Sequence, residues 1–300
     1  MVKIPNISFF KLCDQYWEMR GKQLRTNGLR TILEIWKREF GKILVKELTR
    51  PRIEKMLRDR MERDGVTAST RNRHLAMLKS MFQSAIKWGL MRENPAKGIP
   101  KLRETGARTR FLDQDEVRVL LEAADESFRP ILVTALHTGM RRSELLNLRW
   151  SDVDFGNRII MVRESKSGKQ RAIPIDQTLY QTLCTLPSRF RRGYVFPSPK
   201  SPDRPLSDLT HAFRRLVKKV GLTNLRLHDA RHSFASHLVM NGVDIRTVQE
   251  LLGHASLTMT MRYSHLAPVH RTRALQILDS VLATDTKTDT VAKMGKSGSR

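Results

Sequence analysis

Residues 228–265 read HDARHSFASHLVMNGVDIRTVQELLGHASLTMTMRYSH and carry four of the side chains on which the functional prediction depends. The stretch predicts a helix that begins at His228, runs to Met240 and stops at Asn241-Gly242. Because His228 and Arg231 are three positions apart, they share a face of that helix. An imidazole and a guanidinium at a helix N-terminus favour a bound phosphate, although a capping histidine beside a surface arginine gives the same pattern.

The same stretch ends with two further candidates. Leu-Leu-Gly-His at 251–254 places His254 after an apolar pair, and Tyr263 follows in a short segment rich in Thr and Met. A tyrosine has a pKa near 10, so it serves as a nucleophile only where several cations stabilise its phenolate. The alternative interpretation of Tyr263 is a tyrosine of the hydrophobic core.

Two candidates lie upstream. In Thr-Gly-Met-Arg-Arg-Ser-Glu at 138–144, between apolar segments that predict helices, Gly139 permits a tight turn that presents Arg141 to a ligand. Lys166 lies between two β-branched runs that predict a hairpin, and from such a turn its ammonium can reach a phosphate ester. The alternatives are a surface arginine at a helix corner and a solvated lysine.

The charge of the chain indicates a polyanionic partner. The 300 residues carry 55 Lys+Arg and 30 Asp+Glu, a formal net charge of +25. Residues 1–110 hold 26 Lys+Arg and 11 Asp+Glu, net +15. Residues 111–300 hold 29 Lys+Arg and 19 Asp+Glu, net +10. Both parts are positive, so we expect both to contact a duplex, with binding that weakens steeply as salt rises.

Several classes of protein are excluded. No run approaches the roughly 18 apolar residues of a membrane span, and the N-terminus has no signal-peptide pattern. The two cysteines, Cys13 and Cys184, argue against a disulfide framework and a Cys-based zinc site. A globular intracellular protein that binds nucleic acid fits these features best.

Helical periodicity dominates the first hundred residues, and the composition then changes. Four cations of the helix predicted at 70–88 lie off its apolar stripe and predict a DNA-binding surface, a solvated face being the alternative; they are Arg71, Arg73, Lys79 and Lys87. The chain divides into a helical domain at 1–95, a basic linker at 96–110, a domain at 111–267 with a small hairpin, a C-terminal helix at 268–283 and a disordered tail at 284–300.

The order of these motifs resembles that of the tyrosine recombinase (phage integrase) family. The resemblance covers about residues 108–270 and rests on TGMRRSE, the hairpin lysine of SKSG, HDARH, LLGH and RYSH. Residues 7–90 look like that family's helical core-binding domain, without room for a separate arm-binding domain before it. The resemblance implies an α+β fold, mainly α with a small sheet or hairpin. It also implies a site-specific recombinase that integrates or excises a mobile element or prophage.

The resemblance assigns roles to the reacting groups. Arg141 and Arg231 would clamp the scissile phosphate and stabilise the transition state. His254 would hydrogen-bond a non-bridging oxygen. Tyr263 would attack the phosphorus, leaving a 3′-phosphotyrosyl bond and a free 5′-hydroxyl.

It also assigns the proton transfers. Lys166 would protonate the leaving oxygen, and His228 would assist proton transfer with the tyrosine. Glu144 is expected to be a structural partner of a basic side chain. No metal and no cofactor such as ATP is implied, because cations supply the electrostatics and the phosphotyrosyl ester retains the bond energy.

The implied partners are duplex DNA with specific recombination sites, a homo-tetramer on that DNA and accessory DNA-bending proteins, with no membrane. The C-terminal helix carries an apolar stripe that docks on a neighbouring protomer or, alternatively, folds back on its own domain. The expected location is the bacterial cytoplasm, on the nucleoid, with a bacterial or phage gene.

Two other functions are alternatives to a recombinase. A type IB topoisomerase uses a similar set of Arg, Lys, His and Tyr side chains, but the LLGH motif favours the recombinase. A non-catalytic DNA-binding regulator would be expected to have lost Tyr263 or an arginine, and this chain retains them.

Overall fold

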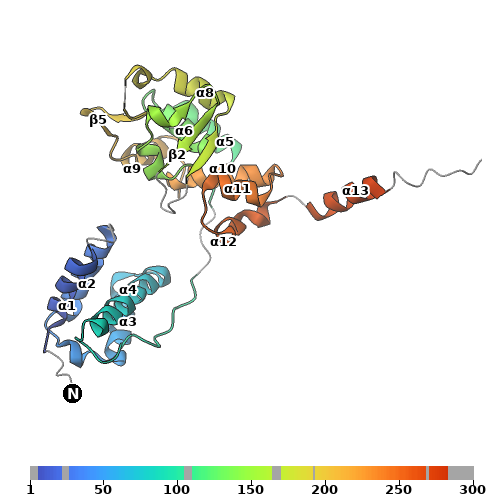
Figure 1. The fold of residues 1–300 in the computed structure, drawn as a ribbon. Coiled ribbons are helices and arrows are strands. Elements are labelled where there is room, and N and C mark those ends of the chain that lie inside the picture. The colour runs from blue at the N-terminus through green and yellow to red at the C-terminus, as the bar shows by residue number, and fades with distance from the viewer. Residues whose placement is uncertain are drawn as a thin grey trace, which may run out of the picture. The chain divides into compact units, whose positions relative to one another are not determined.

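The computed structural model describes residues 6–21, 27–104, 110–163, 170–191, 193–267 and 270–282. The chain divides into an N-terminal unit, Met1–Ala107, and a C-terminal unit, Arg108–Arg300 (Figure 1). Over the described ranges, none of the helices combines the length and the apolar character needed to cross a bilayer. The predicted hairpin turn with Lys166 and the tail at 284–300 lie outside these ranges.

The N-terminal unit is helical, as predicted. Its helices are α1 (Phe9–Tyr16), continued by a π-helical turn (Trp17–Gly21), then α2 (Asn27–Phe40), a short 3-10 turn (Val45–Glu47), α3 (Arg50–Asp64) and α4 (Ala68–Lys87). The Thr67 hydroxyl accepts from the Thr70 N–H and so caps α4. Gly65 ends α3 with φ of 61°, in the left-handed region that favours glycine.

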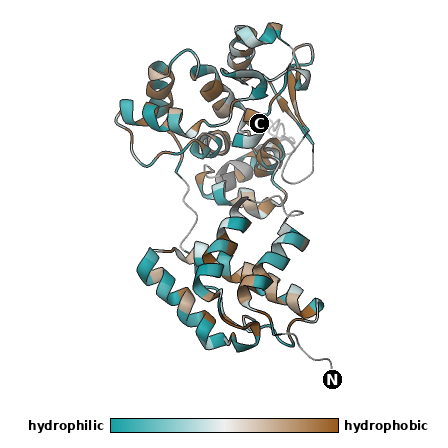
Figure 2. Ribbon diagram, turned by 90° about the vertical axis from the view of Figure 1, so that its left-hand side faces the viewer, coloured by the Kyte–Doolittle hydropathy of each residue, from teal (hydrophilic) through white to brown (hydrophobic). Residues whose placement is uncertain are grey.

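A hydrophobic core holds these helices together. Trp36, Phe9 and Phe82 are fully buried, and the Phe9 ring meets that of Phe40 edge-on at 5.5 Å between centroids. The hydrophobic faces of the helices turn inward and the hydrophilic faces outward (Figure 2). Cys13 lies in this core, where burial raises the pKa of its thiol to about 12, so the thiol stays protonated and unreactive.

The C-terminal unit is mainly helical with a small sheet, so the predicted fold class is confirmed. Its helices are α5 (Gln114–Ala123), α6 (Arg129–Thr138), α7 (Arg142–Leu146), α8 (Gln177–Cys184), α9 (Thr210–Lys219), α10 (His228–Met240), α11 (Ile245–Leu252), α12 (Leu257–Thr260) and α13 (His270–Leu282). Short 3-10 turns lie at Trp150–Asp152, Pro187–Phe190 and Met261–Leu266.

The strands are short and antiparallel. Strands β1 (Val153–Asp154), β2 (Ile159–Val162) and β3 (Arg171–Pro174) form a sheet in that order, with Ile160 opposite Ile173. The pairing of β2 with β3 is the predicted hairpin. A second pair, β4 (Pro197–Ser198) and β5 (Ser201–Pro205), was not predicted because its prolines hide the strand pattern.

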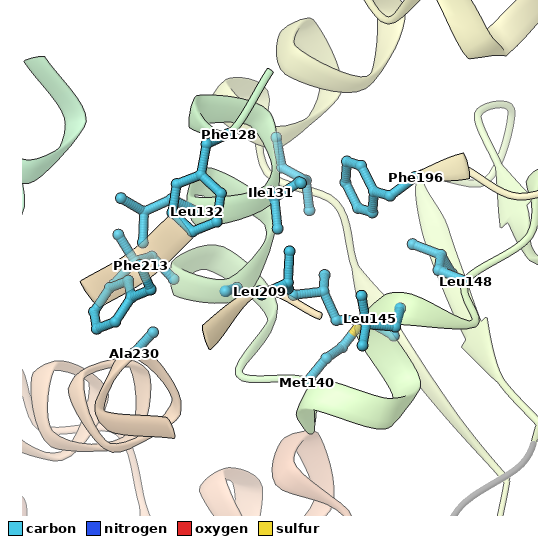
Figure 3. Packing of buried hydrophobic residues seen from close by; sticks show 14 of the residues in the cluster. Phe128, Ile131, Leu132, Met140, Leu145, Leu148, Phe196, Leu209, Phe213 and Ala230 are labelled. Atoms are coloured by element: carbon cyan, nitrogen blue, oxygen red, sulfur yellow. The ribbon is translucent and has the colours of Figure 1, made fainter. Parts of the chain in front are cut away.

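Helix α6 is the centre of the C-terminal core and leads directly into the site. Its residues from Ile131 to Leu136 are all buried, as expected for a helix that is apolar on every side. Leu132, Phe128 and Phe213 lie together in this core, with Ala230 of α10 beside them (Figure 3). The packing of α6 against α10 thereby fixes the two segments that carry Arg141 and Arg231.

Candidate active site

The C-terminal end of α11 collects three arginines from distant parts of the chain. The last carbonyls of a helix have no partner within the helix and form the negative end of its dipole, so they attract cations. The pairs are Arg171 Nε with the Leu251 carbonyl at 2.8 Å, Arg231 Nη2 with the Leu252 carbonyl at 2.8 Å, and Arg141 Nη2 with the Gly253 carbonyl at 3.0 Å. The Leu-Leu-Gly segment of the LLGH motif is therefore a backbone receptor for guanidinium groups.

Glu144 is the carboxylate at the centre of these cations. Its side chain is 2% exposed, and it receives Arg141 Nη1 at 2.7 Å and Arg171 Nη2 at 2.7 Å. Burial alone would raise the pKa of Glu144, but the hydrogen bonds from Arg171 and Arg141 outweigh burial and lower it. Glu144 is thus an ionised structural partner of two arginines, as the sequence led us to expect.

Arg231 is held by the backbone on two sides. Its Nη1 donates to the Gly139 carbonyl at 2.6 Å, in addition to the Leu252 contact, and the residue is 4% exposed. Burial, followed by the positive charge of Arg141, lowers the pKa of Arg231 to about 9, so the guanidinium remains charged at neutral pH. Gly139 has φ of 57°, and a Cβ there would lie 2.5 Å from the Phe234 ring, so the turn requires glycine.

The histidines of the site are neutral at pH 7. Burial, then the charge of Arg231, lowers the pKa of His254 to about 4, and its Nδ1 lies 2.8 Å from the Thr260 hydroxyl. Burial, again followed by Arg231, also lowers the pKa of His228. A neutral imidazole can both donate and accept a hydrogen bond, which suits contacts with a phosphate oxygen or a transferring proton.

Tyr263 lies in a hydrophobic cluster, and its role as a nucleophile stays a prediction. The residue is 1% exposed and packs in a small apolar cluster with Val239, Val248 and Leu252. Its hydroxyl lies 2.6 Å from Nδ1 of His232. Burial raises the pKa of Tyr263, while the positive charges of Arg262 and Arg231 oppose that rise.

One cavity of about 390 Å³ brings the predicted groups together. Its lining residues are Arg141, His228, Arg231, His232, His254, Thr258, Met259, Arg262 and Tyr263. They include all the predicted catalytic residues except Lys166, which lies outside the described residues. Three arginines and no carboxylate line the described wall, so the cavity suits a phosphate diester.

The four cations predicted to bind DNA have different surroundings. Arg71 is buried and its Nη1 donates to the Pro100 carbonyl at 2.6 Å, while Lys79 Nζ donates to the Ile99 carbonyl at 2.8 Å. Both therefore hold a segment of their own unit against α4. Arg73 and Lys87 have exposed side chains. Contact of any of the four with DNA remains a prediction.

Two residues of the site were missed from the sequence. Arg171, the first residue of β3, gives no local signal because its partner Glu144 lies in a different segment. His232 had a signal, since it lies four positions after His228 and therefore shares its helix face. Only the structure places it on the hydroxyl of Tyr263.

Family models match both units of the chain. The model of the Phage integrase family matches residues 110–270, which contain the cavity, and the model of the phage integrase N-terminal domain matches residues 7–103. Among curated relatives, the integrase of Salmonella phage P22 is 25% identical over 320 residues, 93% of this chain and 82% of that protein. The tyrosine recombinase XerA of Pyrococcus horikoshii is 34% identical over 223 residues, 72% of this chain and 76% of that protein.

A solved structure has the same fold. A lambda integrase tetramer bound to a Holliday junction matches with a TM-score of 0.70 at 22% identity, covering 84% of this chain and 79% of that one. At this identity the likeness is one of fold. It agrees with a helical N-terminal part joined to a mainly helical part that contains a small sheet.

Proposed function

Because the chain belongs to the phage integrase family of tyrosine recombinases, we propose that Tyr263 is the nucleophile of its reaction and that the cavity around it receives the scissile phosphate. The chain is a site-specific DNA recombinase of the integrase class, an enzyme that exchanges DNA strands. The observation that supports the proposed site is the convergence of Arg141, Arg231, His254 and Tyr263 on one cationic cavity.

The two arginines of the cavity would stabilise the phosphorane. Charge on the non-bridging oxygens increases as the nucleophile attacks, and charge-assisted hydrogen bonds strengthen with it. Backbone carbonyls hold Arg141 at 3.0 Å and Arg231 at 2.6 and 2.8 Å, so both guanidinium groups are oriented before DNA arrives. His254, fixed by Thr260, would donate to a non-bridging oxygen.

The strand transfer is a transesterification. Tyr263 Oη forms a bond to phosphorus as the bond from phosphorus to the 5′ oxygen breaks, which leaves a 3′-phosphotyrosyl ester and a 5′-hydroxyl. Lys166 would supply the proton of that hydroxyl. Attack by the 5′-hydroxyl of a second strand reverses the step and completes the exchange.

We assign DNA binding to both units. Residues 1–95 would form the core-binding domain, 96–110 the linker and 111–267 the catalytic domain, in agreement with the two family matches. The net +15 over residues 1–110 supports a large electrostatic contribution from the first unit. Arg73 and Lys87, both exposed on α4, are the candidate contacts there.

We assign α13 to contacts between protomers. Its apolar side chains are more than half exposed, with Leu275 at 66%, Val281 at 63% and Ile277 at 56%. A helix with this much free apolar surface needs a partner. The tetramer of lambda integrase on a Holliday junction supports a neighbouring copy as that partner, in a homo-tetramer on DNA.

The relatives support a proposal for the cellular setting. Integrases of phages are among them, so we propose a bacterial or phage gene and a place on the bacterial nucleoid. Accessory DNA-bending proteins would bring distant sites together. A pull-down from host lysate with a DNA segment that carries the recombination site tests for them.

A plasmid with two copies of the recognised site separates the three candidate functions. A recombinase produces two smaller circles or an inverted segment. A type IB topoisomerase relaxes supercoiled plasmid that lacks the site, and a DNA-binding regulator shifts the plasmid without changing its topology. We expect circles or inversion that require the site, and relaxation without the site would favour the topoisomerase.

A further inference from the structure

The hydroxyl of Tyr263 has a buried histidine as its hydrogen-bond partner. Nδ1 of His232 lies 2.6 Å from Tyr263 Oη, and the two residues are 7% and 1% exposed. The ring centroids are 5.8 Å apart, so the imidazole approaches the hydroxyl without stacking on the phenol. This distance is the one required between a nucleophile and its general base.

The charge states of the two groups are compatible with donation from the phenol to the imidazole. Burial raises the pKa of Tyr263, so the phenol carries its proton at neutral pH. Burial, then the neighbouring charges of His228 and Arg262, lowers the pKa of His232 to about 4, so the imidazole is neutral. In the tautomer of His232 that carries its proton on Nε2, the phenol O–H donates and Nδ1 accepts, which is the arrangement that proton transfer from Tyr263 requires.

His228 is placed differently. Its ring centroid lies 4.9 Å from that of His232, with the planes at 84°, so the rings of His228 and Tyr263 both lie against His232. The resemblance had assigned the tyrosine's proton transfer to His228. The measured contact favours His232, which lies one helical turn later in α10.

We propose that His232 accepts the phenol proton of Tyr263 during strand cleavage and returns it during resealing. The inference rests on the proposed function of Tyr263 as the nucleophile. In cleavage the O–H bond of Tyr263 breaks, the bond from Oη to phosphorus forms, and the bond from phosphorus to the 5′ oxygen breaks. The proton moves to Nδ1 of His232, and the 5′ oxygen takes its proton from a separate donor, for which we have proposed Lys166.

The charges around His232 determine how readily its imidazole holds a proton. His228, Arg262 and Arg231 disfavour an imidazolium there, and Asp229 favours one. Arg262 and Arg231 also stabilise the phenolate of Tyr263. These cations lower the pKa of His232 and oppose the burial that raises the pKa of Tyr263. They therefore favour the phenolate and keep the imidazole free to accept a proton.

The test measures cleavage of a nicked suicide substrate by a variant that has an aromatic ring at position 232 but lacks the Nδ1 acceptor. We expect His232→Phe to bind DNA within twofold of the parent and to form the covalent adduct about 100- to 1,000-fold more slowly at pH 7. The deficit should shrink as pH rises, because hydroxide then removes the phenol proton. Replacement of Tyr263 by a fluorotyrosine of lower pKa should shrink it at constant pH.

Two further variants separate chemistry from folding. His237→Phe changes another histidine of α10, one that contacts the Leu112 carbonyl and lies outside the cavity, and it should cleave within threefold of the parent. His232→Gln keeps a polar side chain that can accept a hydrogen bond. Because an amide does not take up a proton at neutral pH, His232→Gln should also form the adduct slowly, with a deficit that shrinks as pH rises. Its rate is the one to compare with the parent if His232→Phe does not fold.

The outcomes are distinct. Cleavage by His232→Phe within threefold of the parent at pH 7 overturns the inference. A slow rate that responds neither to pH nor to fluorotyrosine also overturns it, because a structural defect behaves in that way. If the parent protein binds its site but forms no adduct at all, the proposed function itself fails and the inference fails with it.

Discussion

Arg171 holds the carboxylate of Glu144 with two nitrogens, Nη2 at 2.7 Å and Nη1 at 3.3 Å, although the residues are 27 positions apart. Both side chains are buried, at 7% and 2% exposure. Glu144 in turn holds Arg141, which lines the cavity. Arg171 is therefore a positioning residue that connects the start of β3 to the arginine proposed to bind the phosphate.

Loss of Arg171 should destabilise the C-terminal unit. Arg171→Met leaves Glu144 buried with one of its two cationic partners removed, and breaking a buried pair costs about 3–5 kcal/mol. The surviving Arg141 contact places the expected loss near the lower end of that range. Denaturant unfolding of the parent and the variant measures it.

Arg118→Met is the matched control for this experiment. Arg118 pairs with Asp115 at 3.2 Å and Glu122 at 3.8 Å, but its side chain is 61% exposed. An exposed pair contributes about 0–1 kcal/mol, so the control should unfold nearly as the parent does. Equal losses for the two variants would contradict the role given to Arg171.

The stability of the C-terminal unit should fall between pH 7 and pH 5. His232 and His254 have pKa values lowered to about 4, mainly by burial, against 6.5 for an unperturbed histidine. Below pH 6.5 the unfolded chain binds protons at these positions and the folded chain does not, so falling pH favours unfolding. We expect at most about 2 kcal/mol from each histidine at pH 5.

Hydrogen exchange of the α10 and α11 amides at pH 7 and pH 5, corrected for intrinsic exchange rates, measures the change in stability. Both helices belong to the C-terminal unit, so the measurement reports on that unit. His254→Asn removes one of the two titrations, so its stability should depend less on pH than that of the parent. A parent protein whose protection is the same at pH 5 and pH 7 would show that these histidines ionise normally in the fold.

DNA binding should lose orders of magnitude in affinity between low and moderate salt. Deletion of residues 1–100 should reduce both the affinity and the slope of log K against log salt. If the exposed Arg73 contacts a phosphate, Arg73→Gln should reduce that slope by about one. Fluorescence anisotropy across a salt series measures the slopes, and an isotherm insensitive to salt would contradict the prediction.

Truncation after about residue 268 should separate DNA binding from assembly. Removal of α13 takes away exposed apolar side chains such as Leu275 and Val281 but no residue that lines the cavity. We expect nearly unchanged binding to one site and loss of the synaptic tetramer and of strand exchange, as seen in native gels and two-site recombination. Recombination at the full-length rate would show that α13 does not link protomers.

Periodic apolar patterns predicted most of the helices, because each pattern reports its own helix face. The segment 70–88 was predicted and α4 spans Ala68–Lys87. The polar face of the same helix was predicted less well. Residues 99–102 pack across it, and their carbonyls accept hydrogen bonds from Arg71 and Lys79. The periodicity of α4 alone cannot reveal these contacts.

The site likewise contains residues that the sequence predicted and residues that it did not. The predicted catalytic groups of the described chain lie in short motifs, where residue type and local spacing carry the information. Arg171 lies outside any motif, since it is positioned by the proximity of β3, α7 and the end of α11. The contact of His232 with Tyr263 depends on the packing of α10 against the 3-10 turn Met261–Leu266, a tertiary relationship.

The most direct test of the account is covalent trapping with Tyr263→Phe on a nicked suicide substrate. The variant loses only the phenol oxygen, so the ring stays in its apolar cluster and the arginines stay on their carbonyls. We predict DNA binding equal to that of the parent and no covalent protein–DNA adduct, whereas the parent accumulates one whose linked peptide contains Tyr263. An adduct formed by Tyr263→Phe would contradict the assignment of the nucleophile and with it the mechanism.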